Sequence, residues 1–124
     1  MNRLQHFLRA KTQYNLHSPL VFRLYTEVLF SRSAEAPRGR GFDAVLWRLE
    51  HHYGATAQCC DEGGAMAELA TADGRFLLVD RPHRREALWR QLCDDPRYEV
   101  TLDLFDCGLA VANPRLSRQH FLLR

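Results

Sequence analysis

The end of the chain, residues 98–124, constrains the fold most, because two strand patterns follow each other there with a change of phase. Apolar residues alternate with polar ones from Val100 to Leu104, the period that is typical of a half-buried strand. The apolar positions then change parity and become Phe105, Cys107, Leu109 and Val111. We therefore expect one long strand with a bulge or bend around residues 105–108. After the turn residues Asn113 and Pro114, we expect residues 120–124 to pair back antiparallel, which makes a terminal hairpin that must pack on other elements.

Length and composition predict a single domain with its own core. The chain has 124 residues, of which 46% are hydrophobic, and no run approaches the ~18 apolar residues of a membrane span. Because the start is polar and charged through Lys11, we expect no secretory signal and a cytoplasmic, non-membrane protein. The net charge of +2 is too small to indicate a nucleic-acid or membrane partner. Of the 17 lysines and arginines only Lys11 is a lysine. We attribute this to base composition of the gene, the alternative being contacts to phosphate or carboxylate.

The cysteines predict thiols rather than a disulfide or metal site. Cys59, Cys60, Cys93 and Cys107 contain no C-x-x-C spacing. On a strand, the adjacent Cys59 and Cys60 would point to opposite faces, which is unsuited to a shared metal. We expect free, mostly buried thiols.

The order of elements predicts an open α/β sheet. We expect helices at residues 2–11, from Pro19 to about 30, at 42–53 with Gly54 as the stop, at 65–71, and from Pro82 to about 95. We expect strands at 55–60 and 75–80 and in the terminal hairpin, and residues 31–41 have the composition of a linker. Strands that alternate with helices favour a sheet that is parallel until the final antiparallel hairpin. The domains expected are a helical extension at 1–32, a linker at 33–41 and an α/β domain at 42–124.

Three stretches, taken together and in order, resemble a known family. They are residues 14–22 (YNLHSPLVF), residues 78–89 (LVDRPHRREALW), and residues 100–105 (VTLDLF) with the closing HFLLR at 120–124. They resemble a group of small bacterial class I methyltransferases that depend on S-adenosylmethionine (SAM) and have a helical N-terminal extension. The resemblance implies a reduced Rossmann-like (class I methyltransferase-like) α/β sheet of about four strands.

The middle of the chain departs from that family. The family's glycine-rich cofactor loop should fall at Asp61, Glu62, Gly63 and Gly64, but its E-x-G-x-x-x-G pattern is absent and two acids stand where backbone should approach the ligand. The strands that would carry the ribose-binding acid are missing as well, since a βαβ unit needs ~30 residues. Deleting one wall of the crevice outside the strand ends removes most of the buried area for a cofactor.

Asp80, at the end of a predicted strand, and the nearby His83 are the best candidates for chemistry. The carboxylate could act as a base or bind a metal, and the imidazole could accept a proton. We favour the alternative that Asp80 caps the helix that opens at Pro82. His17 is the candidate for a substrate channel, although a loop histidine beside a helix N-cap is favoured.

Other polar groups have simpler structural interpretations. No pairing of His51 and His52 with Cys59 and Cys60 has the usual spacing of zinc ligands, so we expect no metal. The carboxylates of Glu99, Asp103 and Asp106 could do acid–base work, but they are interpreted as the solvent face of the long strand. Cys93 and Cys107 are interpreted as core thiols.

The function expected is that of a degenerate methyltransferase-like protein without SAM-dependent catalysis and without a cofactor. It would act through its surface, with a protein partner or as a homo-oligomer, because lost strands would expose a sheet edge or former interior surface. The alternative is an active SAM-dependent methyltransferase with a rebuilt or dimer-completed cofactor site. A gene remnant without selected activity is the third interpretation.

Overall fold

The computed structural model describes residues 19–24, 28, 39, 41–60, 63–116 and 118–123. Its elements, in chain order, are α2 (Pro19–Arg23), α3 (Phe42–Tyr53), β1 (Gln58–Cys59), β2 (Met66–Thr71), β3 (Gly74–Asp80), the 3₁₀ helix η3 (Pro82–Arg84), α4 (Glu86–Asp94), β4 (Val100–Asp103), β5 (Cys107–Ala112) and β6 (Gln119–Leu122). The helix expected at residues 2–11 and most of the expected linker lie outside the described residues.

The six strands form one mixed sheet in the order β1-β2-β3-β5-β4-β6. Every neighbouring pair is antiparallel except β4 and β6, which are parallel. The expected mixed α/β class is confirmed. The strand count of about four was wrong, and so was a sheet that is parallel until its last hairpin, because β1, β2 and β3 form an antiparallel meander.

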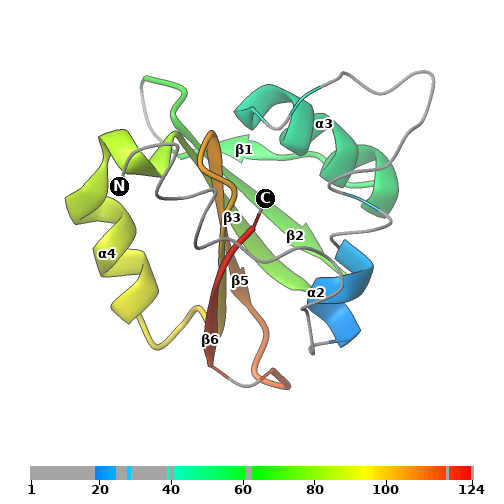
Figure 1. Cartoon of the computed structure of the whole chain (residues 1–124). Helices are drawn as coiled ribbons and strands as arrows, with labels where there is room; N and C mark the ends of the chain where they lie inside the picture. Colours follow the sequence, from blue (N-terminus) through cyan, green and yellow to red (C-terminus); the bar gives the residue numbers. More distant parts are fainter. Residues whose placement is uncertain are drawn as a thin grey trace.

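Helices cover both faces of the sheet (Figure 1). α4 lies on one face, and α2 and α3 lie on the other. The larger core is on the second face, where Leu24, Val45 and Leu49 pack on sheet residues that include Phe76 and Leu109. The smaller core joins Leu92 of α4 to sheet residues Leu77, Val79 and Ala110. No helix in the described part of the chain is long and apolar enough to span a bilayer.

Helix α3 and strand β3 were predicted correctly from their patterns. α3 ends at Gly54, whose left-handed backbone (φ 62°, ψ 34°) lets its N–H bond the carbonyl of Glu50, a geometry that glycine adopts without cost. In β3 the continuous apolar run from Phe76 to Val79 is buried throughout, because helices cover both faces of the sheet there. The strand expected at 55–60 is present as the short β1.

The helix expected at residues 65–71 was wrong, because this segment is strand β2. It pairs with β3 along its whole length, from Met66 opposite Val79 to Thr71 opposite Gly74. Ala67 and Leu69 are buried, and Glu68 between them is only partly buried. The good helix formers of this segment are overridden by the ladder that β3 offers.

The terminal segment folds as two antiparallel strands instead of one bulged strand. Phe105 takes a left-handed backbone (φ 72°), and the N–H of Asp106 bonds the carbonyl of Leu104 at 3.0 Å. The chain therefore reverses between β4 and β5. A last strand is present, but the antiparallel pairing expected for it was wrong, because β5 is already flanked by β3 and β4. β6 consequently pairs with the outer side of β4, in parallel.

Candidate functional site

The carboxyl ends of β1, β3, β4 and β6 lie on the same side of the sheet, here called the strand-end edge. These strands run in the same direction, because β2 and β5 are antiparallel to both of their neighbours. Mostly parallel open α/β sheets bind ligands outside such strand ends, and four strands of this sheet share that direction. Asp80 ends β3 and Asp103 ends β4, so this edge is the candidate site.

Asp80 is held by Arg81 and Arg85. Its Oδ2 accepts hydrogen bonds from Nε of Arg81 at 3.1 Å and from Nη2 of Arg81 at 3.0 Å. Arg85 donates from Nη1 to the Asp80 carbonyl at 2.7 Å. Neither η3 nor α4 has a side-chain cap, so the interpretation of Asp80 as a helix cap was wrong. Its carboxylate instead forms an ion pair with a half-exposed guanidinium.

His83 is fixed on the turn between β4 and β5. Its ring stacks on Phe105 with centroids 3.9 Å apart and planes 6° from parallel, and its Nδ1 lies 2.9 Å from the Phe105 carbonyl oxygen. A carbonyl only accepts, so Nδ1 carries the hydrogen and the neutral ring keeps its lone pair on Nε2. Asp80 and His83 thus belong to one edge but form no bond to each other.

Two residues near His83 have strained backbones. Arg81 (φ 45°) and Phe105 (φ 72°) are the positive-φ residues other than glycine among the described residues, and the Arg81 N–H bonds the Asp106 carbonyl at 3.1 Å. Left-handed conformations at such residues cost of order 1–3 kcal/mol and are concentrated at functional sites. The loop after β3 and the β4–β5 turn are therefore locked together under strain.

A hollow of about 530 Å³ lies beside this edge. It lies between the first turn of α3, the turn before β2 and the end of β3, and it is lined by Gly41, Phe42, Asp43, Ala44, Gly64, Asp80 and Arg81. Ligand pockets commonly have ~300–1,000 Å³. The hollow brings Gly64 of the expected cofactor loop next to Asp80, which the sequence did not predict.

The turn that contains Gly63 and Gly64 joins two antiparallel strands. Gly64 has φ 68°, and the N–H of Cys60 bonds the carbonyl of Met66 at 3.1 Å across the β1–β2 hairpin. A strand follows this turn, whereas a cofactor loop of the family is followed by a helix whose N-terminus approaches the ligand. Asp61 and Glu62 lie outside the described residues.

The other predicted histidines are His17 in the N-terminal part of the chain and His51 and His52 in the last turn of α3. His17 is outside the described residues. His51 stacks on Trp47 at 3.7 Å, and His52 lies edge-on to Tyr53. Within the described residues no group of three or more His, Cys, Asp or Glu side chains could hold a metal ion.

The carboxylates of the terminal strands have structural roles. Asp103 Oδ1 accepts the Phe105 N–H at 2.9 Å, which fixes the reversal after β4. Glu99 Oε2 accepts the N–H of Asn113 at 3.3 Å. Asp103 and Asp106 are partly exposed. Asp103 therefore shapes the turn through its hydrogen bond and also lies near the strand-end edge.

The cysteines are free thiols, as expected, but they are not mostly buried. Cys59 and Cys60 are exposed, Cys93 is half-buried and Cys107 is buried. Burial raises the pKa of the Cys107 thiol strongly, and nearby Asp80 adds to the effect. Burial also raises the pKa of Cys93, which lies 3.6 Å from the Thr101 hydroxyl.

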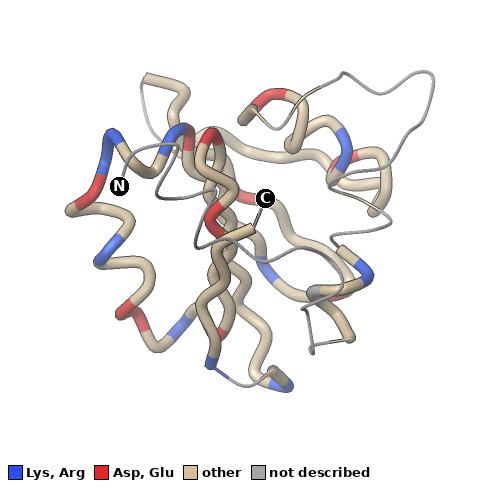
Figure 2. The backbone as a smooth tube through the Cα atoms, in the orientation of Figure 1, with Lys and Arg blue, Asp and Glu red and all other residues tan. Residues whose placement is uncertain are grey.

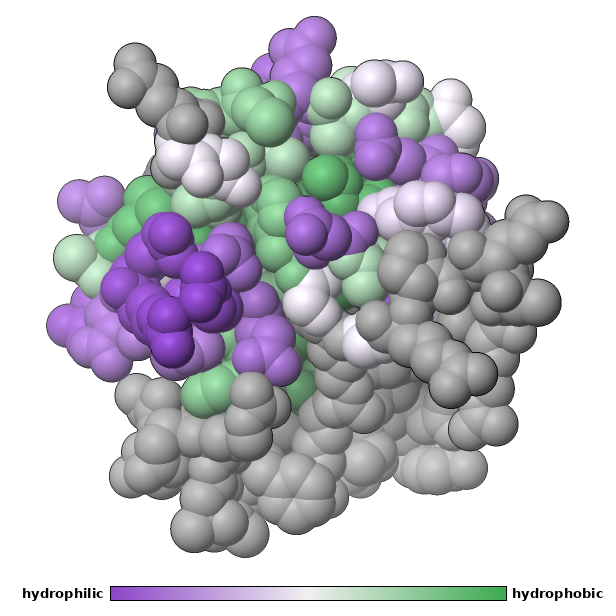
Figure 3. Space-filling view, turned by 90° about the horizontal axis from the view of Figure 1, so that it is seen from above, coloured by the Kyte–Doolittle hydropathy of each residue, from purple (hydrophilic) through white to green (hydrophobic). Residues whose placement is uncertain are grey.

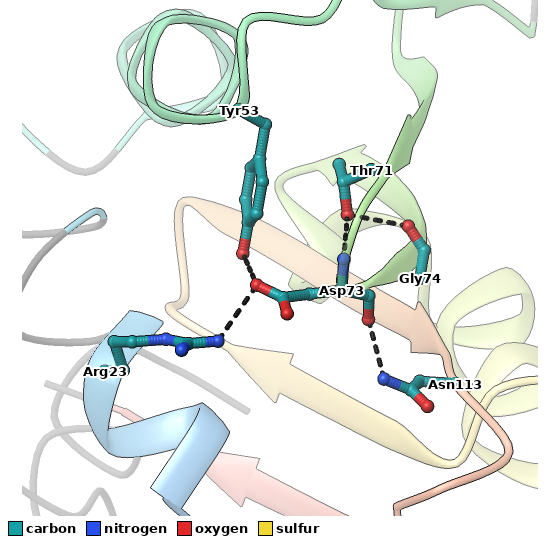
Figure 4. Close-up of polar contacts among 6 residues, drawn as sticks. All are labelled: Arg23, Tyr53, Thr71, Asp73, Gly74 and Asn113. Atoms are coloured by element: carbon teal, nitrogen blue, oxygen red, sulfur yellow. Dashed lines mark hydrogen bonds and ion pairs between the residues drawn. The ribbon is translucent and has the colours of Figure 1, made fainter.

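A second polar cluster, at the opposite edge of the sheet, was missed from the sequence (Figure 4). Asp73 Oδ2 accepts hydrogen bonds from the Tyr53 hydroxyl at 2.7 Å and from Arg23 Nη2 at 3.0 Å. Asn113 Nδ2 donates to the Asp73 carbonyl at 2.8 Å. The cluster ties α2, α3 and the end of β5 to the β2–β3 turn. Burial and the bond to Asp73 raise the pKa of Tyr53. The signal in the sequence was the turn pair Asp73-Gly74, which shows a turn but not its distant partners.

Comparison with protein-family models, with curated proteins and with solved structures finds no match to this chain. The geometry of the strand-end edge is therefore the basis for any function assigned to it.

Proposed function

We propose that this chain is a methyltransferase-like protein that lacks SAM-dependent catalysis and acts as an interaction module. One observation carries the proposal: the Gly63-Gly64 turn closes an antiparallel hairpin, with Cys60 N–H bonded to the Met66 carbonyl. The family resemblance would make this turn the cofactor loop. A loop of that kind works because a helix N-terminus directly behind it presents free N–H groups to the ligand.

Strand β1 forms one edge of the sheet and is protected from strand addition. This argues against self-association by pairing of β1 with a second copy. β1 has two residues, and the outward N–H of Ala57 just before it is bonded to Glu50 Oε2 at 3.0 Å. Short and capped edges are means by which proteins prevent strand addition. Among the described residues Phe22 is the one large hydrophobic side chain that is exposed, at 44%. A partner would consequently engage polar and charged surface rather than β1 or a broad apolar patch.

A second candidate is a SAM-dependent methyltransferase with a rebuilt cofactor site. The hollow favours it, because Gly64 and Asp80 line the same space at the carboxyl end of β3. A carboxylate beside a tight turn is an arrangement that hydroxyl-bearing ligands use. In the hollow this carboxylate is already paired with Arg81, which a ligand would have to displace.

Isothermal titration with SAM and with its demethylated product separates the two candidates. The proposal predicts no saturable heat from a folded sample. Saturable binding that is lost in Asp80→Asn, and retained in the distant control Arg115→Gln, would refute the proposal and favour the second candidate. Sedimentation velocity on the same sample measures self-association independently of the cofactor.

A further inference from the structure

Four arginines lie within η3 and α4 or immediately before these helices. They are Arg81, Arg84, Arg85 and Arg90, here called the arginine patch. Arg84 and Arg90 are exposed, and Arg81 and Arg85 are half-buried. Figure 2 shows basic residues along the upper part of this segment, and Figure 3 shows strongly hydrophilic side chains over the same region on the left of the molecule. His83 lies within the patch, and Glu86 is its one acidic neighbour in this stretch.

The four guanidinium groups divide into two that are engaged and two that are available. Arg81 and Arg85 are bonded to Asp80. Arg84 and Arg90 form no ion pair or side-chain hydrogen bond with any described residue. A single exposed arginine side chain without an ion-pair partner is common on a protein surface. Here two such side chains accompany Arg81, which the Asp80 carboxylate holds, and Arg85, which the Asp80 backbone carbonyl holds.

The patch opposes the dipole of its own helix. α4 begins next to Arg84 and Arg85 without a side-chain cap, Glu86 is the one acid in its first turn, and its end carries Asp94 followed by Asp95. The helix dipole favours acids at the start and bases at the end, by ~0.3–1 kcal/mol for each residue. Helix stability therefore does not account for the distribution of charge, and a local rule broken in this way points to function.

We propose that the arginine patch binds an acidic segment of a partner protein, an inference that rests on the proposed role as an interaction module. A guanidinium pairs with a carboxylate through two parallel hydrogen bonds. The nine residues of α4 span roughly 13 Å, so Asp94 and Asp95 would fall under a nucleic-acid strand laid along the helix and would repel its phosphates. A short acidic segment fits the basic end alone.

The test is a fluorescence-anisotropy titration of the full chain with a labelled oligoglutamate at low salt. We expect binding that weakens as salt is added, and about a fivefold loss of affinity in Arg84→Gln/Arg90→Gln, from two exposed ion pairs. The control, Arg75→Gln/Arg115→Gln, removes the same charge at the end of the sheet opposite to the patch and should bind as the parent does. Because the first variant removes charges that oppose the dipole or are exposed, its melting temperature should not fall, so its loss of binding cannot come from unfolding.

Three results would overturn the inference. They are no binding, an equal loss in the control variant, or tighter binding of single-stranded DNA of matched length and charge, which would assign the patch to nucleic acid. SAM binding in the separate calorimetric titration would refute the proposed function but leave this titration interpretable. The two failures are therefore distinguishable.

Discussion

The indole ring of Trp89 lies directly against the α-carbon of Gly108. A Cβ built on Gly108 would stand 2.6 Å from Cζ3 and 2.8 Å from Cη2 of that ring. The contact sets how closely α4 approaches β5, and it explains why this strand carries a glycine in its interior. The packing of α4 on the sheet thus depends on the large side chain of Trp89 and on the lack of a side chain at Gly108.

Gly108→Ala should destabilise the protein by about 1–3 kcal/mol, because the added methyl group overpacks the contact with Trp89. Urea denaturation measures the change. The matched control is Trp89→Leu, a background in which the same substitution should cost clearly less, since the two sites are coupled. Equal costs in both backgrounds would show that the ring does not set the packing.

Tyr53 should make stability fall at alkaline pH. Its pKa is raised in the folded protein by burial and by the bond to Asp73, so the folded state keeps a proton that the unfolded chain releases above the usual pKa of about 10. The unfolded state then binds fewer protons, and stability decreases as pH rises through this range.

Melting temperatures between neutral and alkaline pH test this effect. In Tyr53→Phe the alkaline fall should be shallower, while stability at neutral pH drops by about 1 kcal/mol from the lost hydrogen bond. A parallel fall in the variant and the parent would place the alkaline effect elsewhere.

The four thiols should react in a fixed order with a disulfide reagent. Cys59 and Cys60 are exposed and should react first. Cys93 is half-buried with a raised pKa and should follow. Cys107 is buried and its pKa is strongly raised, so its reaction should require unfolding. Mass spectrometry of the labelled peptides assigns each step, and early labelling of Cys107 would contradict the packing of β5.

The imidazole of His83 should be the tautomer with hydrogen on Nδ1. The Phe105 carbonyl oxygen at 2.9 Å can only accept from it. Long-range ¹H–¹⁵N correlation spectra distinguish the two tautomers. Phe105→Leu removes the ring that stacks on His83, so the preference for the Nδ1–H tautomer should be weaker in this variant. A spectrum with hydrogen on Nε2 would reverse the assignment of the atom that can accept a proton.

Helix α3 and the buried strand β3 could be predicted because their signals are local. The apolar spacing of 42–53 and the following Gly54 define α3, and the run from Phe76 to Val79 defines β3. Residues 65–71 could not be assigned from propensity, since Ala, Met, Glu and Leu favour a helix. The sequence does show Ala67 and Leu69 at alternate positions, as in a strand with one buried face. The segment is too short for this pattern to outweigh the helix propensity of its residues.

The reversal at Phe105 was missed because its residue type does not announce a left-handed turn. The available signal was Asp103, whose side chain bonds the N–H two residues later, a pattern that aspartate often makes in turns. The pairing of β6 depends on which edge is still free once β5 has been inserted between β3 and β4. That information is not local, so no pattern within residues 119–123 contains it.

The central claim is that the Gly63-Gly64 turn closes an antiparallel hairpin, and one nuclear Overhauser measurement tests it directly. Cys59 faces Ala67 in the β1–β2 register, and the bond from Cys60 to Met66 makes this the non-hydrogen-bonded pair, in which the two α-carbons approach most closely. We predict a strong cross-peak between the α-protons of Cys59 and Ala67. Absence of this cross-peak, together with medium-range cross-peaks between residues i and i+3 along 66–71, would contradict the account. Those cross-peaks would indicate a helix after the turn, which is the strand–turn–helix arrangement of a cofactor loop.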